Sequence, residues 1–219
     1  KIIKQVAEGI KKTSPNAFVI CITNPLDVIV MAFQKYSGLP TNKVVGMAGI
    51  LDSSRFKYFL SQELKVPVKS VESLVLGGHG DAMVPMPNQT KVNSKPLNQL
   101  IEKGKLDLII ERTRKGGGEI GKLLQKGSAF YAPASAGIEM GESYIKNLKR
   151  ILPCAAYLNG EYGVKNLYVG VPVVIGSDGV EKVVELTLDE EETKNLNISI
   201  KAVKELYKAA CKIDQELNN

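Results

Sequence analysis

The sequence is poor in several residue types that mark particular classes of protein. Its 219 residues include no tryptophan, one histidine, three cysteines and only four arginines beside 25 lysines. Cys21, Cys154 and Cys211 lie far apart and none belongs to a Cys-x-x-Cys pair, so neither a disulfide framework nor a metal cluster is indicated. We expect a protein of a reducing compartment, the cytoplasm, with no bound metal.

Long apolar runs are also missing. Residues 17–22 and 167–175 fall well short of the roughly 18 residues that a membrane-spanning helix needs, and the second run contains Pro172. Residues 1–12 are amphipathic and charged, whereas a secretory signal has an apolar core. We therefore expect a soluble protein without a membrane partner.

Positive charge is present but is not concentrated. The formal net charge is +6, yet the lysines are spread among acidic residues, and the aromatic residues (eight Tyr and five Phe) are not interleaved with a basic cluster. Nucleic-acid-binding segments more often combine both features, so we expect no nucleic-acid partner. A small anionic substrate remains compatible with this charge.

The first third of the chain predicts an α/β arrangement. With 44% hydrophobic residues, the chain is long enough for one large or two small domains. Continuous apolar runs predict buried parallel strands at 17–22 and 43–46, and helical periodicity predicts helices at 1–12, from 25 onward and at 50–63. In such sheets ligands bind at the carboxyl ends of strands, which is where Thr23 and Asn24 lie.

The rest of the chain predicts shorter strands and longer helices. Strands are expected at residues 73–76, 83–85, 90–92, 151–158, 167–175 and 180–188, with 83–85 and 90–92 forming an antiparallel hairpin. Helices are expected at residues 96–126, with an interruption at the glycines 116–118, at 133–149 and from 189 to about 215. The acidic start of the last helix suits its dipole.

The only histidine, His79, follows the strand expected at 73–76. Two glycines precede it and one follows, which lets the backbone turn and lets a ligand approach the imidazole closely. This arrangement would present a proton-transfer group. A structural histidine in a tight turn is the alternative, and the residue's own surroundings leave both open.

Asp52 and Arg55 lie three residues apart on the helix expected at 50–63, and therefore on one face. They could form a weak ion pair at the surface. They could equally point into a cleft, because apolar residues flank them. The spacing does not decide between these two interpretations.

A glycine-rich segment at 116–122 formally matches two nucleotide-binding patterns, Gly-x-Gly-x-x-Gly and most of the phosphate loop. Both patterns require a strand immediately before the glycines, and here a charged helical run precedes them. Leu123 also replaces the hydroxyl residue that would hold magnesium. We interpret the segment as a kinked helix whose glycines permit close packing.

Three short segments are distinctive when taken together. They are Ile-Thr-Asn-Pro-Leu-Asp at 22–27, Leu-Asp-Ser-Ser-Arg-Phe at 51–56 and Gly-Gly-His-Gly-Asp at 77–81. In this order and at these separations they resemble the lactate/malate dehydrogenase family, most of all its lactate-dehydrogenase-like malate dehydrogenases. The resemblance extends through 127–134 and 168–176 into the last helix.

The resemblance implies a role for each matching residue. His79 would accept the hydroxyl proton of a 2-hydroxy acid and return it in the reverse direction, and Asp52 would bind the far nitrogen of its ring. Arg55 would bind the substrate carboxylate, and Asn24 would bond the reacting oxygen. Ile22, Thr23 and Asn24 would lie along the nicotinamide half of NAD.

The resemblance also implies a fold and a division of the chain. We expect the C-terminal part of a Rossmann-type parallel sheet at 1–46, followed at 47–219 by an α+β substrate domain with antiparallel strands and long helices. The family's Gly-x-Gly-x-x-Gly motif and mobile substrate loop have no counterpart in these residues. The expectation is that the 219 residues are a carboxyl-terminal portion that binds NAD poorly and turns over little or nothing by itself.

The function that follows is NAD-dependent oxidation of malate to oxaloacetate, with lactate dehydrogenase of the same family as the alternative. Ala129 and Pro133 shape the expected pocket without deciding between the two substrates. Two functions from other classes stay open: a non-catalytic assembly module and, less favoured, a phosphate-loop nucleotide hydrolase using 116–122. The family resemblance further suggests a homodimer or homotetramer.

Overall fold

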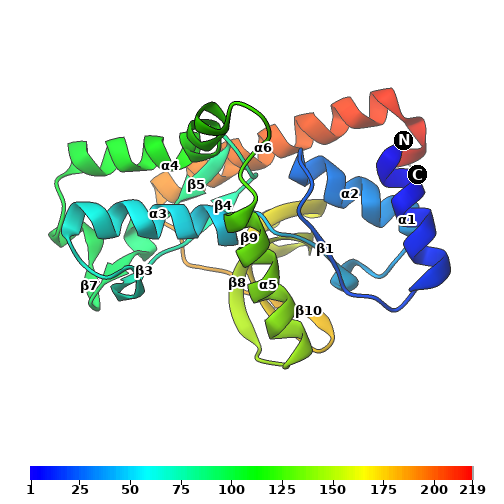
Figure 1. Cartoon of the computed structure of the whole chain (residues 1–219), viewed down its shortest axis with the longest axis horizontal. Coiled ribbons are helices and arrows are strands. Elements are labelled where there is room, and N and C mark those ends of the chain that lie inside the picture. Colours follow the sequence, from blue (N-terminus) through cyan, green and yellow to red (C-terminus); the bar gives the residue numbers. More distant parts are fainter. Residues whose placement is uncertain (219) are drawn as a thin grey trace.

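The computed structural model describes residues 1–218 and has the expected mixture of helices and strands (Figure 1). The helices are α1 (Ile2–Thr13), α2 (Leu26–Ser37), α3 (Gly49–Leu64), α4 (Lys103–Leu124), α5 (Tyr131–Ile145) and α6 (Glu190–Ile213). The strands are β1 (Val19–Cys21), β2 (Val44–Gly46), β3 (Val71–Glu72), β4 (Val75–Gly77), β5 (Met83–Pro85), β6 (Lys91–Val92), β7 (Lys95–Pro96), β8 (Arg150–Asn159), β9 (Lys165–Gly176) and β10 (Gly179–Val183).

One sheet connects the front of the chain to its remainder. Its strand order is β1-β2-β8-β9-β4-β5, and β10 pairs with β9. The β1 and β2 strands are parallel, as their continuous apolar runs predict, whereas β8, β9, β4 and β5 pair in antiparallel fashion. The expected fold class is therefore confirmed: parallel Rossmann-type strands followed by an α+β part with antiparallel strands and long helices.

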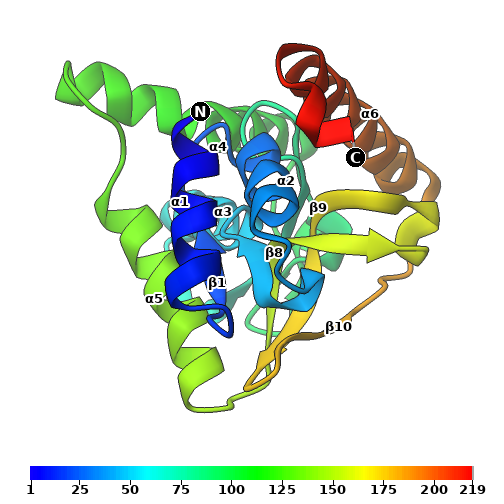
Figure 2. The same cartoon turned by 90° about the vertical axis from the view of Figure 1, so that its right-hand side faces the viewer.

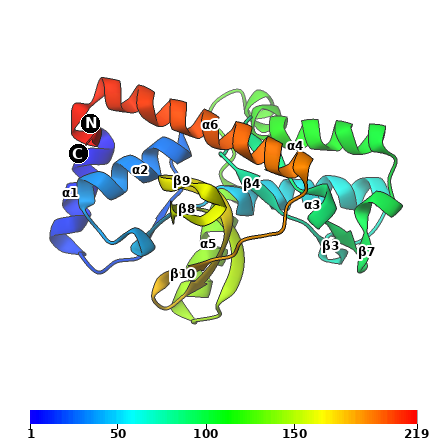
Figure 3. The same cartoon turned by 180° about the vertical axis from the view of Figure 1, so that it is seen from behind.

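Helices cover the sheet and bury its side chains. α5 and α6 lie on opposite sides of β8 and β9 (Figure 1, Figure 2), while α1 and α2 pack side by side near β1 (Figure 2). α6 extends across the molecule and contacts α2, β4 and β5 (Figure 3). The buried side chains of β8 and β9 form the centre of the main apolar core. This packing holds the ends of β1 and β4 in fixed positions.

The last helix has the start that its sequence predicts. Asp189 caps α6 by accepting a hydrogen bond from the Glu192 N–H at 2.8 Å, and the Glu192 carboxylate accepts one from the Asp189 N–H at 3.3 Å. This reciprocal arrangement satisfies backbone N–H groups that a helix otherwise leaves free. The acidic first turn also interacts favourably with the helix dipole.

The hairpin predicted from residues 83–92 is wrong. Met83–Pro85 pairs with Val75–Gly77 across the turn that contains His79, and not with the next strand. Lys91–Val92 instead joins Val71–Glu72 and Lys95–Pro96 in a separate small sheet. The turn residues Pro87–Gln89 form a short 3-10 helix that separates the two sheets.

The predicted interruption at glycines 116–118 is wrong, because α4 is helical without a break from Lys103 to Leu124, and it begins later than the predicted residue 96. Packing against α3 supplies stabilisation that the glycines' helix propensity lacks. The kinked shape is visible, since the last turns of α4 run in a different direction from the rest of the helix (Figure 1, Figure 3). Close packing at the glycines is confirmed: a Cβ on Gly116 would lie 3.2 Å from Cδ of Arg55. The strand predicted at 180–188 ends earlier, at Val183.

Candidate active site

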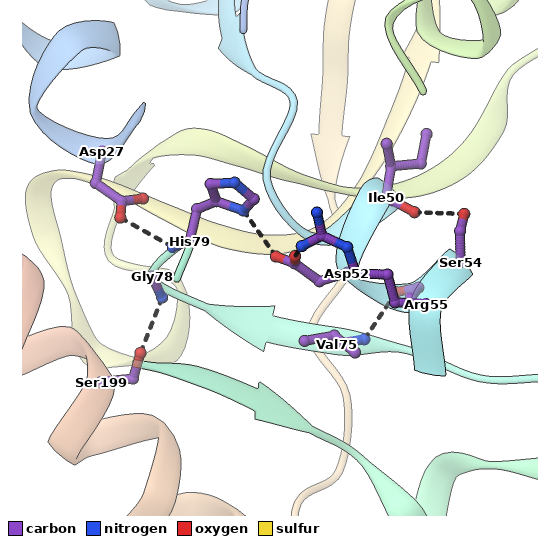
Figure 4. Close-up of polar contacts among 10 residues, drawn as sticks. Asp27, Ile50, Asp52, Ser54, Arg55, Val75, Gly78, His79 and Ser199 are labelled. Atoms are coloured by element: carbon purple, nitrogen blue, oxygen red, sulfur yellow. Dashed lines mark hydrogen bonds and ion pairs between the residues drawn. The ribbon is translucent and has the colours of Figure 1, made fainter. Parts of the chain in front are cut away.

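Three segments far apart in the sequence meet at one cavity. The carboxyl end of β1 supplies Asn24, the first turns of α3 supply Arg55, and the end of β4 supplies His79. All three side chains line a cavity of about 890 Å³, a size within the range of about 300–1,000 Å³ that small-molecule sites occupy. Figure 4 shows His79 facing the start of α3.

The backbone geometry before His79 depends on glycine. Gly77 has a φ of 82°, in the left-handed region that other residues rarely adopt, and a Cβ there would lie 2.3 Å from the hydroxyl of Ser199. The predicted need for glycine before His79 is confirmed at this position. The turn directs the imidazole away from the sheet and toward α3.

His79 and Asp52 form a close pair. The Nδ1 atom of His79 lies 2.8 Å from Oδ2 of Asp52, whose side chain is 1% exposed (Figure 4). Burial, the largest influence, lowers the pKa of His79, but the hydrogen bond and charge of Asp52 together with the charge of Asp27 outweigh it. The pKa of His79 consequently lies above its ordinary value, so the folded protein favours the protonated ring more than a free histidine does.

Arg55 lies on the other side of the same carboxylate. Its Nη1 atom is 3.4 Å from Oδ1 of Asp52, and its side chain is 13% exposed. No hydrogen-bond acceptor among residues 1–218 reaches its buried Nε. The planar guanidinium therefore retains donors for a carboxylate ligand, which it can bind through two parallel hydrogen bonds. The pair therefore does not lie at the surface: Arg55 lines the cavity, and Asp52 is buried beside it at ion-pair distance.

The end of β1 provides an apolar and a polar surface side by side. Ile22 is 38% exposed and lines the cavity together with Thr23 and Asn24. Pro133 and Ala134 of α5 line it as well. An exposed apolar strand end beside amide and hydroxyl groups suits a flat, partly polar ring such as nicotinamide, so these residues fit the cofactor that the sequence predicts.

Three residues at this site were not singled out from the sequence. Asp27 accepts a hydrogen bond from the main-chain N–H of His79, and Ser199 accepts one from the N–H of Gly78. Arg114 lines the cavity and donates through Nε to the Met83 carbonyl at 3.2 Å. Its status as one of only four arginines could have drawn attention to it. Ser199 gave no signal, because 121 residues separate it from Gly78.

Other kinds of site are not apparent in the described part of the chain. Within residues 1–218, no three His, Cys, Asp or Glu side chains gather closely enough to hold a metal ion. No helix within the same range combines the length and the apolar character needed to span a membrane. The glycine-rich segment 116–122 lies within α4, where the preceding residues are helical, so it lacks the strand-to-helix turn that cradles phosphate.

Comparison with known proteins identifies the class of protein to which the chain belongs. Residues 1–46 match the family model of the lactate/malate dehydrogenase NAD binding domain, and residues 50–213 match that of the lactate/malate dehydrogenase alpha/beta C-terminal domain. Together these matches cover most of the chain. The chain belongs to the lactate/malate dehydrogenase family.

Two individual relatives show which members of the family the chain resembles. The chain is 66% identical to a malate dehydrogenase of Pelagibacter ubique, over 100% of this chain and 70% of that protein. It is 55% identical to a malate dehydrogenase of Methylobacterium radiotolerans, over 99% of this chain and 69% of that protein.

Solved structures agree with these relatives. Malate dehydrogenase from Salinibacter ruber superimposes with a TM-score of 0.95 at 45% identity, covering 98% of this chain and 70% of that one. Lactate dehydrogenase from Cryptosporidium parvum, in complex with lactic acid and nicotinamide adenine dinucleotide, superimposes with a TM-score of 0.94 at 47% identity. The match covers 100% of this chain and 68% of that one.

Proposed function

We propose that the protein is an NAD-dependent malate dehydrogenase that interconverts malate and oxaloacetate, a reaction of the tricarboxylic acid cycle. The observation that carries the proposal is the His79–Asp52 pair, with 2.8 Å between Nδ1 and Oδ2, in a cavity that Arg55 also lines. The relatives at 66% and 55% identity, both malate dehydrogenases, support the choice of reaction.

The proposed role of His79 follows from which of its two ring nitrogens already has a hydrogen-bond partner. Asp52 occupies Nδ1 of His79, which leaves Nε2 to exchange a proton with the substrate oxygen. During oxidation the hydroxyl proton moves to Nε2, and the resulting positive charge is stabilised by Asp52. During reduction the same proton returns. When bound, NAD supplies the hydride acceptor for the substrate carbon.

Substrate positioning is assigned to two further residues. Arg55 holds the carboxylate next to the reacting carbon, because a guanidinium fixes both its position and its plane. The amide of Asn24 donates to the reacting oxygen from the end of β1, and the strand end formed by Ile22, Thr23 and Asn24 receives the nicotinamide ring. The boundary between the cofactor part at 1–46 and the catalytic part at 47–219 remains a prediction.

Replacing His79 with asparagine tests the proton-transfer role. In the full-length protein, H79N should lower kcat for oxaloacetate reduction by at least roughly 100-fold, since general acid–base catalysis contributes about 10² to 10⁴. The assay follows the loss of NADH absorbance as the cofactor is oxidised. Near-normal turnover by H79N would refute the assignment.

Lactate dehydrogenase is the second candidate, favoured by the similarity to the Cryptosporidium parvum lactate dehydrogenase structure at 47% identity. Both reactions would use the same His79, Asp52 and Arg55. The ratio of kcat/KM for oxaloacetate to that for pyruvate separates them. We expect a large preference for oxaloacetate, and a preference for pyruvate would reassign the substrate.

A homodimer or homotetramer is also proposed. Tyr131, Ile138 and Ile145 recur every seven residues on α5 and are 84%, 71% and 80% exposed. An exposed apolar stripe of this kind is typical of a surface that another subunit covers. A cytoplasmic location is proposed as well, supported by cysteines 21, 154 and 211, which are free and buried.

A further inference from the structure

His79 is held at two places by two different carboxylates. Asp52 binds its ring, whereas Asp27 binds its main chain (Figure 4). Asp52 comes from α3 and Asp27 from the first turn of α2, so the two carboxylates approach from separate elements. The proposed catalytic role accounts for Asp52 and leaves Asp27 unexplained.

The surroundings of Asp27 are unusual for a charged side chain. It is 3% exposed, and its Oδ2 accepts the His79 N–H at 2.9 Å. Its other oxygen, Oδ1, is buried, and no hydrogen-bond donor among residues 1–218 reaches it. A buried carboxylate with one oxygen left without a donor is costly, because the charge has lost its water without full replacement. An uncharged acceptor would hold the same N–H at lower cost.

The neighbouring residue provides an example of such an uncharged contact. The N–H of Gly78 donates to the hydroxyl of Ser199 on α6 at 2.8 Å. A Cβ on Gly78 would lie 2.8 Å from Val203 and 3.2 Å from Oδ2 of Asp27, so the strand end is closely packed on both sides. Two successive N–H groups are therefore fixed, one by a neutral hydroxyl and one by a carboxylate.

We propose that Asp27 is a positioning residue for proton transfer by His79: its carboxylate fixes the main chain of His79 and places a second negative charge beside the imidazole. The inference rests on the proposed function, in which His79 exchanges the substrate proton. Asp27 acts through His79 and does not itself touch the substrate. Its charge is the property that distinguishes it from Ser199.

The electrostatic balance around the ring supports this role. The charges of Asp27 and Asp52 raise the pKa of His79, whereas burial and the charge of Arg55 lower it. Burial in turn raises the pKa of Asp27 to about 6, opposed by the hydrogen bond and charge of His79. Asp81 of the same turn and Arg114 of α4 line the cavity as further charged groups. On the α6 side, Ser199 and Val203 lie against Gly78, and both are uncharged.

The test compares removal of the charge with removal of the neutral contact. Asp27→Asn keeps an oxygen that can accept the His79 N–H but removes the charge, and Ser199→Ala removes the neighbouring neutral contact. His79 is the one histidine among the 219 residues, so the signal that is lost in H79N identifies it, and NMR titration of that signal reports its pKa. Asp27→Ser is a second charge-removing variant for use if Asp27→Asn does not fold.

Charge removal should lower the pKa of His79 by roughly 0.5 to 1, while Ser199→Ala should leave it unchanged. In the full-length protein, oxaloacetate reduction requires protonated His79, so the fall of kcat/KM with rising pH should move to lower pH by the same amount in Asp27→Asn.

An unchanged pKa in both charge-removing variants would overturn the role of Asp27, as would equal pKa shifts in Asp27→Asn and Ser199→Ala. A shift in the NMR titration without a matching shift in the kinetic profile would also overturn it. Near-normal activity of H79N would instead overturn the proposed function, so the two failures are distinguishable.

Discussion

At the scale of single residues, the pairing with Asp52 is what keeps the pKa of a largely buried imidazole above its ordinary value. Replacing Asp52 with asparagine leaves burial unopposed by that carboxylate, so the pKa of His79 should fall below its ordinary value of 6.5. Oxaloacetate reduction near neutral pH should slow by roughly 100-fold or more. NMR titration of the one histidine measures the pKa, and an unchanged value would show that the contact is not an effective charge pair.

The same pair links stability to pH. Because the pKa of His79 is raised above 6.5 in the folded protein, its stabilising contribution is fully present below pH 6.5 and is lost as the pH rises through the raised value. In D52N that loss of stability above pH 6.5 should be absent, and urea denaturation across this pH range measures it.

Asp27 has the opposite effect on stability. The pKa of Asp27 rises from 3.8 to about 6 on folding. Below pH 3.8 the carboxyl is protonated in both the folded and the unfolded protein, so it does not lower the free energy of unfolding. Above about pH 6 it is ionised in both, and the free energy of unfolding is lowered by the whole difference between the two pKa values. Asp27→Asn should therefore be more stable than the native protein at about pH 8, by up to roughly 3 kcal/mol, and should show no gain at about pH 4. Urea denaturation at both pH values measures the difference.

Ser199→Ala is the matched control for that prediction, since it removes a neighbouring contact without a titratable group. Its effect on the free energy of unfolding should be the same at both pH values. If Asp27→Asn changed the free energy of unfolding equally at both pH values, ionisation of Asp27 would not be what destabilises the folded protein.

Residue-level inference from the sequence succeeded where local pattern carries the information. The glycines mark His79 and the three-residue spacing places Asp52 and Arg55 on one helical face, the family resemblance implied that they act together, and the structure brings these three residues together. Asp27 and Ser199 could not be found in this way. Their importance comes from burial against a turn that is distant in sequence, which only tertiary packing determines.

At the scale of elements, α4 shows a helix shaped to accommodate a side chain of α3. A Cβ on Gly116 would lie 3.2 Å from Cδ of Arg55, tighter than ordinary contact. Gly116→Ala should therefore displace the guanidinium and raise KM for oxaloacetate by roughly tenfold, with a smaller effect on kcat. Steady-state kinetics at saturating NADH measures both constants.

Gly121→Ala is the control within the same helix, because nothing lies within 4 Å of a Cβ there. It should leave KM unchanged and raise the thermal midpoint slightly, since alanine favours helix more than glycine does. Equal KM values for native and Gly116→Ala protein would show that α4 does not position Arg55.

Most long elements were predictable, whereas the two-residue strands β3 and β7 were not. The apolar runs of β8 and β9 and the periodicity of α1, α2, α3 and α6 span enough residues for a clear pattern. The two-residue strands β3 and β7 carry no periodicity at all. For β5 and β6 the strand positions were right but the pairing was wrong, because partner choice depends on the turn at Gly80 and not on the strands' own residues.

At the scale of the whole molecule, the exposed apolar stripe on α5 predicts self-association. Ile138→Lys places a charge in its centre, where the native side chain is 71% exposed, so the monomer should fold normally but associate less. Light scattering after size exclusion should give a lower mass than that of the native oligomer. Ile213→Lys, at an 89% exposed position at the end of α6, is the control and should retain the native mass.

The arrangement of the whole chain explains why the site forms where it does. The sheet places the end of β1 and the end of β4 at the same cavity, although more than 50 residues separate Asn24 from His79. The α/β class could be predicted from the apolar runs, and a ligand site at Thr23 and Asn24 from their place at a strand end, whereas the meeting of Asn24 with His79 was implied by the family resemblance. The small sheet beside α3 and α4 could not, since its strands are too short to leave a pattern.

The most direct test of the central claim is a crystal structure of the full-length protein with NADH and oxamate, a keto-acid analogue that cannot be reduced. The account predicts that the analogue's carboxylate binds Arg55 through two hydrogen bonds and that its carbonyl oxygen lies about 3 Å from Nε2 of His79, with Nδ1 still on Asp52. An analogue bound elsewhere, or a His79 ring turned away from both the analogue and Asp52, would contradict it.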